Sequence, residues 1–376
     1  MKLYVVTASI RKLDNLKQLL QNFNNESGEN CDLNVIIIDE VDDEVRKYNR
    51  KIMSTFKNTR FFGVKERGKW FKSHFGSASR KYESAIPEKC HAETSFGFVV
   101  AYEEDADVII ELDDDVALHK GYSLNEHLRN LFRNGGFTVF AKAKWYNSME
   151  NLVLNENVQV FPRGHPYDKE CRREDYEWAN SASTSVLNMG LWSGEPDLDA
   201  LTLIYHSGLD GSCHLKGDGL KREKVIVGKG TYFAICSMNT GFLSKIIPAF
   251  YQLYMNQLGI DRFDDIWSGI FLKKITDYMN ESVSIGAPML THRKAPRDSF
   301  SDLRKEMEGM DLNERLWRAV DSMSLSGNSY LDAYMSLTQN LSTAVLSIGR
   351  TKAQRDFLEF QIQKMQTWAS LMDSLS

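Results

Sequence analysis

The stretch "ADVIIELDDDVAL" at residues 106–118 decides the fold, because it joins an apolar run to three consecutive carboxylates. The apolar run is typical of a strand that is buried on both faces of a sheet. Asp113, Asp114 and Asp115 repel one another, and burying an unpaired carboxylate is costly. The triplet is therefore either a solvated turn or a site for a strongly positive group.

Two earlier apolar runs have the same character, namely "KLYVVTAS" (2–9) and "LNVIIIDE" (33–40), and each is followed by a helical pattern. This alternation favours an α/β fold with a parallel sheet covered by helices. In open α/β sheets, ligands bind beyond the carboxyl ends of the strands. We therefore expect Thr7 and Asp39 to lie on this rim with the aspartate triplet and to contact substrate. Arg11, Asp113 and Asp114 are also predicted to contact substrate.

The triplet is also a candidate metal site. Residues i and i+2 of a strand point to the same side, so Asp113 and Asp115 are predicted to converge on one cation while Asp114 points elsewhere. Mg²⁺ and Mn²⁺ bind a few carboxylates together with phosphate oxygens and water, and they neutralise a departing diphosphate. His292 in "PMLTHRKAP" suits a mixed nitrogen–oxygen set for Mn²⁺, and Lys294 suits phosphate. The alternative for both is a structural or solvated role.

Composition narrows the class of protein. The 376 residues are 42% hydrophobic and 11% aromatic, and the net charge of −5 predicts no global attraction to nucleic acid or membrane. Five cysteines without CxxC spacing argue against a disulfide framework or a structural zinc site. The first residues resemble a strand rather than a signal peptide, and no apolar run is long enough to span a membrane. We expect a cytoplasmic protein.

The middle of the chain is expected to complete the same domain with mixed strands and long loops. The strand-like pieces are "FTVFAKAKWY" (137–146) and "YFAIC" (232–236). "RFDDIWSGIFLKKITDYM" (262–279) is predicted to be an amphipathic helix that begins near an acidic pair. These elements extend the first domain over residues 1–309.

Residues 310–376 are predicted to form a helical C-terminal extension. Apolar residues recur there at helical spacing, and they are Leu358, Ile362, Met365, Ala369 and Met372. We expect this stripe to pack on the core or on another subunit, so that the helices provide a possible surface for a homo-oligomer.

Ordered blocks of residues 4–307 resemble the reversibly glycosylated polypeptides, which include the UDP-arabinopyranose mutases. The blocks include "TASIRKLDNL", "ETSFGFVVAYEEDADVIIELDDDV", "FPRGHPY", "GLWSGEPDLDA", "GKGTYFAICSMNTGF", "RFDDIWSGIFLKKI" and "THRKAPRDSFSDLRKE". The resemblance implies a GT-A glycosyltransferase fold, a mixed sheet flanked by helices. It also implies a UDP-sugar bound beside Mn²⁺ or Mg²⁺.

The resemblance assigns roles residue by residue. The triplet matches the family's Asp-Asp-Asp motif, and His292 and Lys294 fall in its His-x-Lys-Ala stretch. Arg163 matches the arginine that is reversibly glycosylated in the mutases; the alternative is that it grips phosphate. Because guanidinium is protonated and a poor nucleophile, a carboxylate must orient it or accept its proton, and Asp264 and Asp265 are the candidates.

Two further residues are predicted to contact substrate. Asn239 is placed to hydrogen-bond sugar hydroxyls. Trp192, in the Gly-Leu-Trp block, is either a substrate contact or a core residue.

One departure from the family keeps a second function open. Glu170 stands where the family has a second arginine, and this favours a glycosyltransferase that uses an external glycan, protein or modified DNA base as acceptor. A basic patch for such an acceptor would contain Arg172, Arg173, Lys221 and Arg222. The third reading is a sugar-nucleotide-binding subunit without catalysis, its tail serving assembly.

Overall fold

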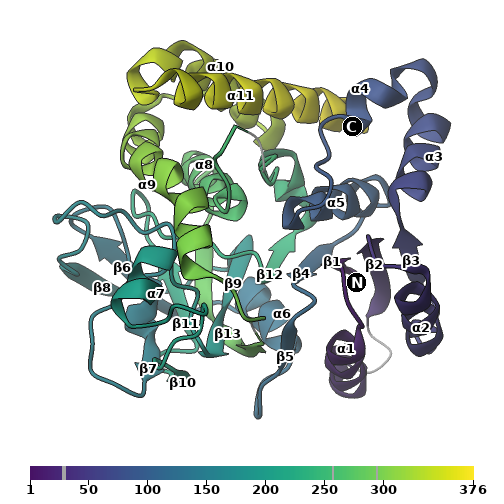
Figure 1. Ribbon diagram of the computed structural model, residues 1–376, viewed down its shortest axis with the longest axis horizontal. Helices are drawn as coiled ribbons and strands as arrows, with labels where there is room; N and C mark the ends of the chain where they lie inside the picture. The colour runs from purple at the N-terminus through teal and green to yellow at the C-terminus, as the bar shows by residue number, and fades with distance from the viewer. Residues whose placement is uncertain (28–30, 256–257, 294) are drawn as a thin grey trace.

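The computed structural model describes residues 1–27, 31–255, 258–293 and 295–376 (Figure 1). Within them, thirteen strands form one mixed sheet that is flanked by helices, as the sequence predicts. The main order is β3-β2-β1-β4-β12-β9-β13-β11-β6-β8, with β5, β7 and β10 attached at its side. The strands are β1 Lys2–Ser9, β2 Asp32–Asp39, β3 Thr59–Phe62, β4 Val108–Leu112, β5 Val116–Leu118, β6 Gly136–Ala141, β7 Leu152–Leu154, β8 Tyr176–Ser181, β9 Leu187–Gly194, β10 Gly217–Leu220, β11 Lys224–Val227, β12 Asn239–Leu243 and β13 Val283–His292.

Helices and short 3₁₀ turns connect these strands. The α-helices are α1 Asp14–Ser27, α2 Asp43–Met53, α3 Val64–Phe75, α4 Ser79–Glu83, α5 Thr94–Glu103, α6 Asn125–Phe132, α7 Ala200–Tyr205, α8 Asp264–Tyr278, α9 Ser299–Ser322, α10 Tyr330–Ile348 and α11 Lys352–Asp373. The 3₁₀ turns are η2 Gly76–Ala78, η3 His91–Glu93, η4 Ser148–Asn151 and η5 Ser244–Ala249.

The three apolar runs near the start of the chain form β1, β2 and β4, which lie side by side in parallel. β1 lies between β2 and β4 and pairs with both in parallel, with Ser9 opposite Asp39 and Val6 opposite Glu111. Their side chains are almost completely buried, because α5 covers this part of the sheet. The carboxyl ends of the three strands therefore meet at one edge, as expected.

Two predictions for the middle of the chain need correction. "YFAIC" is not a strand, since only Tyr232 pairs, with Trp145. The next residues instead pack against α8, where a Cβ on Gly269 would lie 2.6 Å from the Cβ of Ile235. α8 itself is helical as predicted, but it is buried on nearly all sides rather than amphipathic, because α9 and α10 cover it.

The C-terminal helices α9 and α10 pack on α8, and α11 packs on α10 and reaches α4 (Figure 1). The apolar stripe of α11 is buried within this chain, every member being at most 7% exposed. α9 runs without a break through residues 309 and 310. Of the described helices, none is both long and apolar enough to cross a bilayer. None of the five cysteines, all of which lie within the described residues, forms a disulfide.

Candidate functional site

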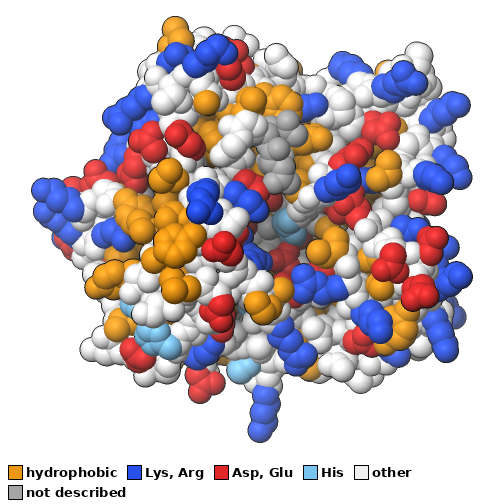
Figure 2. Space-filling view, in the orientation of Figure 1, with side chains coloured by type: hydrophobic (Ala, Val, Ile, Leu, Met, Phe, Trp, Pro, Cys, Tyr) orange, Lys and Arg blue, Asp and Glu red, His pale blue; other side chains and the backbone are white. Residues whose placement is uncertain are grey.

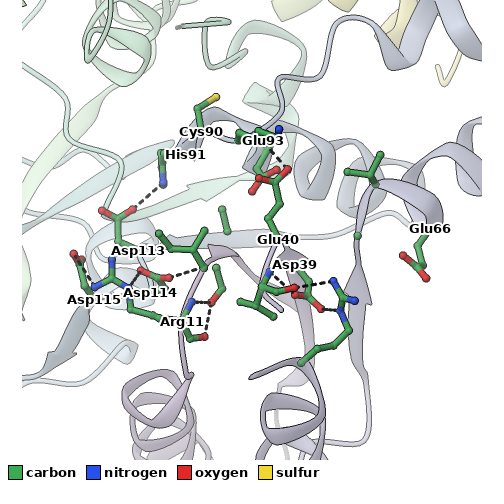
Figure 3. A pocket seen from close by; sticks show the side chains of 18 of the residues that line it. Arg11, Asp39, Glu40, Glu66, Cys90, His91, Glu93, Asp113, Asp114 and Asp115 are labelled. Atoms are coloured by element: carbon green, nitrogen blue, oxygen red, sulfur yellow. Dashed lines mark hydrogen bonds and ion pairs between the residues drawn. The ribbon is translucent and has the colours of Figure 1, made fainter. Parts of the chain in front are cut away.

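A cavity of about 940 Å³ opens where β1, β2 and β4 end (Figure 3). Its lining includes Arg11, Asp39 and the aspartate triplet, as predicted, together with Glu40 and His91. On the face shown in Figure 2, acidic side chains gather in a hollow near the centre. The volume suits a small-molecule ligand of nucleotide-sugar size.

The aspartate triplet forms a turn between β4 and β5 rather than the end of a strand. Asp113, Asp115 and His292 each offer a ligand atom, and these atoms lie within 4.8 Å of one another. Asp114 points away, as expected. Its carboxylate accepts a hydrogen bond from the backbone of Ile10 at 3.0 Å and pairs with Arg11 at 3.0 Å. Burial raises the pKa of Asp114, and Arg11 opposes that rise.

This cluster has the properties of a divalent-cation site. Asp115 is 7% exposed, yet its Oδ1 and the Nδ1 of His292 have no hydrogen-bond partner among the described residues. The Nε2 of His292 lies 3.4 Å from Asp115 Oδ1, and the Nη1 of Arg11 lies 3.7 Å from Asp115 Oδ2. Two carboxylates and an imidazole suit Mn²⁺, and the carboxylates suit Mg²⁺.

His91 connects the aspartate triplet to the interior. Its Nδ1 lies 2.9 Å from Asp113, and its Nε2 lies 3.1 Å from Glu111 and 2.8 Å from the hydroxyl of Ser237. Burial lowers the pKa of His91, but the two carboxylates outweigh that effect and raise it well above its ordinary value. Burial likewise raises the pKa of Asp113, and His91 reverses the shift so that it is lowered.

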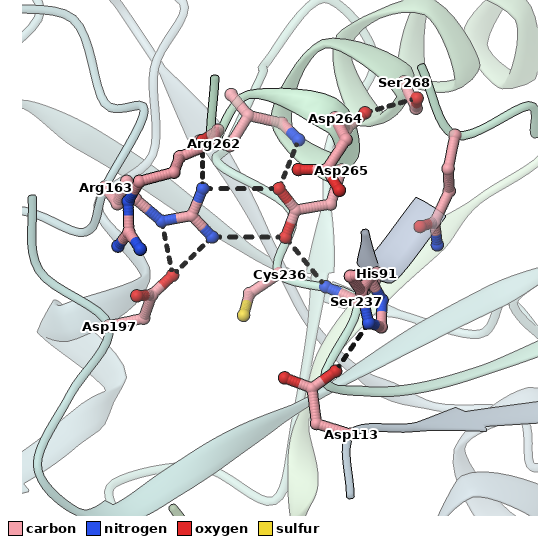
Figure 4. Close-up of polar contacts among 12 residues, drawn as sticks. His91, Asp113, Arg163, Asp197, Cys236, Ser237, Arg262, Asp264, Asp265 and Ser268 are labelled. Carbon is pink, nitrogen blue, oxygen red and sulfur yellow. Dashed lines mark hydrogen bonds and ion pairs between the residues drawn. The ribbon is translucent and has the colours of Figure 1, made fainter. Parts of the chain in front are cut away.

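Arg163 is held by carboxylates on two sides (Figure 4). Its Nε and Nη2 lie 3.1 and 3.0 Å from Asp197 Oδ2, and its Nη2 lies 3.4 Å from Asp265 Oδ2. Nη1 also donates to the backbone carbonyl of Arg262. Only 10% of the Arg163 side chain is exposed, and Arg163 is absent from the cavity lining.

A chain of contacts joins this arginine to the aspartate triplet. The backbone N–H of Ser237 donates to Asp265 Oδ2 at 3.2 Å, and the Ser237 hydroxyl contacts His91, which contacts Asp113 (Figure 4). Along this chain, Ser237 and Asp265 separate Arg163 from His91 in the cavity wall.

The charge state of Arg163 follows from these neighbours. Burial lowers the pKa of Arg163, but Asp197 and Asp265 outweigh it and raise the pKa well above its ordinary value. Asp264 begins α8 beside this pair, and burial together with the charge of Asp265 raises the pKa of Asp264. A carboxylate with a raised pKa is a better proton acceptor.

The far end of the cavity is formed by a buried ion-pair network. Arg67 lies between Glu40, at 3.3 Å, and Glu93, at 3.2 Å. Burial raises the pKa of Glu93 to about 9. Asp39 pairs with Arg46 at 2.8 Å, so this wall carries fixed charges of both signs.

Three of the predicted substrate contacts lie in the protein interior. Thr7 is fully buried in β1, and Trp192 is fully buried in β9. Asn239 is also fully buried, and its amide is occupied by His127 at 2.8 Å and by the carbonyl of Pro288 at 2.9 Å. None of the three is in the cavity lining. Lys294 lies outside the described residues.

Sequence reasoning missed His91, Asp197 and Glu111. His91 lies in the short η3 turn, which has no periodicity, although it stands only two residues before the start of the block at Glu93. Asp197 lies within the block "GLWSGEPDLDA". The sequence shows this carboxylate but gives no sign that it pairs with Arg163. Glu111 is the one charged residue in an otherwise apolar strand, and that exception was the available signal.

The model of the reversibly glycosylated polypeptides matches residues 79–376. The chain belongs to this family. The match includes the C-terminal helices, which the sequence blocks up to residue 307 had not reached. Residues 1–78, which carry β1 and β2, lie outside it.

Curated relatives of this family member include plant proteins. The chain is 28% identical over 251 residues to the probable UDP-arabinopyranose mutase 1 of Pisum sativum, covering 65% of this chain and 61% of that protein. It is 27% identical over 303 residues to the UDP-arabinopyranose mutase 1 of Arabidopsis thaliana, covering 78% and 75%. The chain therefore spans only about three fifths of the length of the pea protein.

Solved structures with a distant likeness are glycosyltransferases. Glucosyl-3-phosphoglycerate synthase from Mycobacterium tuberculosis, in complex with Mn²⁺, UDP and phosphoglyceric acid, has a TM-score of 0.40 and 9% identity, covering 87% of this chain and 80% of that one. A mannosyltransferase from Pyrobaculum calidifontis, in complex with GDP-Man and Mn²⁺, has a TM-score of 0.40 and 9% identity, covering 99% and 84%.

Proposed function

We propose that this protein is a metal-dependent UDP-sugar enzyme that glycosylates itself on Arg163 and interconverts the pyranose and furanose forms of the sugar. The UDP-arabinopyranose mutases among its relatives suggest UDP-arabinose as the substrate. One observation carries the proposal: Arg163, buried between two carboxylates, is connected to the candidate metal ligand Asp113 through side chains at the cavity wall.

The cavity supplies the binding part of the mechanism. A Mn²⁺ or Mg²⁺ ion held by Asp113, Asp115 and His292 would neutralise the charge on the departing UDP. Arg11 lies beside the triplet and is placed to bind phosphate oxygens. Asp39 and Glu40 line the same cavity at the ends of β2, where acceptors for sugar hydroxyls are available.

The transfer step needs a deprotonated nitrogen. A nitrogen of Arg163 attacks the anomeric carbon, the bond from that carbon to the diphosphate breaks, and the electron pair leaves with UDP. The proton from the guanidinium passes to Asp265, which contacts it, or to Asp264, whose raised pKa favours acceptance. In this proposal the ion pairs orient Arg163 and keep its resting guanidinium charged, so the proton must pass to Asp265 or Asp264 as the new bond forms.

The change of ring form then takes place on the protein. The lone pair of the arginine nitrogen forms a double bond to the anomeric carbon, and the ring oxygen leaves that carbon and takes up a proton. The 4-hydroxyl adds to the same carbon and loses a proton, which closes the five-membered ring. UDP displaces Arg163, and the guanidinium regains its proton from the carboxylate. A covalent stage keeps the open sugar from escaping into water.

A glycosyltransferase with an external acceptor is the second candidate. Arg163 is absent from the cavity lining and is tied on three sides, so the bound sugar reaches it only after side chains at the wall move. Glu170, the departure from the family pattern, pairs with Arg173 at the surface and takes no part in the Arg163 contacts. Both observations favour an acceptor other than this arginine.

The deciding experiment offers radiolabelled UDP-sugars, UDP-arabinopyranose first, with Mn²⁺ and with EDTA. We expect metal-dependent formation of the furanose product and label on the protein at Arg163. Arg163→Lys keeps the charge but loses the planar fork, so it should bind UDP nearly as wild type and form neither labelled protein nor product. If wild-type protein takes up no label but passes sugar to an added acceptor, the transferase replaces the mutase.

A further inference from the structure

α9 presents polar residues to the interior of the protein on one of its faces. Asp302, Glu306, Gly309 and Asn313 follow one another at spacings of four, three and four residues, and all four are buried. Such spacing puts them on one side of the helix. A helix that merely covers a core needs apolar residues there, because buried polar groups are costly unless they are hydrogen-bonded.

The first of these contacts reaches the Arg163 loop directly. The side-chain amide of Asn313 donates to the carbonyl of Gly164 at 3.0 Å and accepts from the indole of Trp267 at 3.0 Å. Gly164 has φ +87, and a Cβ at that position would lie 2.5 Å from Ile266. The loop is thus pressed between α8 and α9 immediately after Arg163.

The second contact acts through Arg262. Glu306 is fully buried, and its two oxygens accept from Arg262 Nε at 2.5 Å and from the backbone of Ala200 at 2.7 Å. Arg262 has φ +66, an uncommon conformation for this residue type, and its carbonyl accepts from Arg163. Glu306 therefore joins the segment that supplies this carbonyl to the segment that follows Asp197.

We propose that α9 holds Arg163 in place for transfer, with Glu306 and Asn313 as positioning residues. The inference rests on the proposed function of Arg163 as the sugar acceptor. Neither residue touches the cavity. Both act on groups that contact or adjoin Arg163, so they set its position relative to the anomeric carbon. A misplacement of about 1 Å in a reacting group can cost about a hundredfold in rate.

The test compares Glu306→Gln and Asn313→Asp with Thr338→Val. Glu306→Gln keeps the size but offers a single acceptor oxygen, and Asn313→Asp removes the donor to Gly164. Thr338 is buried on α10 and bonds only the carbonyl of Tyr334, at 2.8 Å. It controls for a general disturbance of the C-terminal helices. Glu306→Asp and Asn313→Ser replace any variant that fails to fold.

Two readouts are measured on each folded variant. The first is the rate of protein labelling by UDP-arabinopyranose, together with UDP affinity. The second is the solvent exchange of the Arg163 Nε–H in ¹⁵N spectra, assigned with Arg163→Lys. We expect UDP affinity within about twofold of wild type, labelling slowed about a hundredfold, and faster Nε–H exchange. Thr338→Val should match wild type in all three.

Unchanged labelling and unchanged exchange in both variants would overturn the inference. If wild-type protein takes up no label, the function proposed for Arg163 fails. The positioning role of α9 is then tested by the Nε–H exchange measurement alone. Faster Nε–H exchange in Glu306→Gln and Asn313→Asp then still supports the positioning role, whereas exchange equal to that of Thr338→Val refutes it.

Discussion

Asp115 is a buried carboxylate whose charge is only partly compensated by its described neighbours. His292 Nε2 lies 3.4 Å away, and Arg11 lies at 3.7 Å. Asp115→Asn keeps the volume and removes the charge. We expect Mn²⁺-dependent UDP affinity to fall by more than about tenfold. The metal-free protein should be as stable as wild type or more stable, because a poorly compensated buried charge is gone.

Titration calorimetry with and without Mn²⁺ measures the first effect, and urea unfolding in EDTA measures the second. Asp218→Asn is the matched control, since Asp218 is exposed on β10 and is not part of the cavity lining. An Asp115→Asn variant that binds UDP with Mn²⁺ as tightly as the control would remove Asp115 from the metal site.

The pKa of His127 leads to a prediction of how the free energy of unfolding depends on pH. It is fully buried, one ring nitrogen contacting Asn239 at 2.8 Å and the other Asn188 at 2.9 Å. Burial lowers the pKa of His127 to about 4, whereas the unfolded value is 6.5. The unfolded chain therefore binds a proton in this range that the native state does not. His127 should therefore contribute a fall of about 3 kcal/mol in the free energy of unfolding as pH drops through that window.

Urea unfolding at several pH values checks this expectation. His127→Gln should flatten the dependence between about pH 4 and 6.5 by close to one proton. His214→Gln, at a side chain that is 49% exposed, should leave it as in wild type. An unaltered slope in His127→Gln would mean that another group carries the acid sensitivity.

Asn239 also shows what a single sequence hides at this scale. A polar residue in a predicted strand near a candidate site suits a sugar contact, but its partner His127 is 112 positions away. Asp39 and the triplet lie at the cavity, where their position at strand ends predicted them, but the same argument also predicted Thr7, which is buried in β1. Pairings between distant loops, such as Arg163 with Asp197, need the assembled fold.

At the scale of elements, α9 packs against Phe263, the residue before α8. This contact predicts whether Gly309→Ala stabilises or destabilises the protein. Gly309 lies so close to Phe263 that a Cβ would be 2.4 Å from its ring, and Phe263 is 1% exposed. A helical glycine changed to alanine normally stabilises by about 1 kcal/mol. Overpacking a rigid ring costs about 1–3 kcal/mol, so Gly309→Ala should destabilise on balance.

Gly68→Ala in α3 is the matched substitution. There the new Cβ would meet only the end of the flexible Glu83 side chain, at 3.2 Å. We expect Gly68→Ala to raise the free energy of unfolding by up to about 1 kcal/mol. Urea midpoints of both variants decide the matter, and a stabilising Gly309→Ala would show that α9 can shift away from Phe263.

The sequence predicted elements well where a local pattern is sufficient. The apolar runs of β1, β2 and β4 are correct because strands buried on both faces are apolar throughout. α8 was recognised as a helix, but its burial on nearly all sides depends on α9 and α10, which come later in the chain. The segment "YFAIC" is apolar because it crosses the core, and apolar character alone does not distinguish that from a strand.

At the scale of the whole molecule, the C-terminal helices are part of the same core as the sheet. Trp368 of α11 is fully buried, stacks on Tyr251 with ring centroids 5.1 Å apart, and donates to the carbonyl of Pro248 at 3.2 Å. The apolar stripe of α11 is already buried within the chain, so it is not available as an oligomer interface. A homo-oligomer stays a prediction and would have to use another surface. The division after residue 309 stays a proposal, and these contacts allow it to be tested.

Trp368→Ala provides that test, because all five cysteines lie at or before residue 236. Thiol reactivity therefore reports unfolding of residues 1–309 only, whereas circular dichroism reports helix throughout. Removing a buried tryptophan costs about 3–5 kcal/mol. We expect both probes to shift together to lower urea, since the helices and the sheet share one core. Leu346→Ala, at an 81% exposed position on α10, should shift neither. If Trp368→Ala moves the dichroism midpoint and leaves thiol reactivity unchanged, residues 310–376 unfold by themselves and form a separate domain.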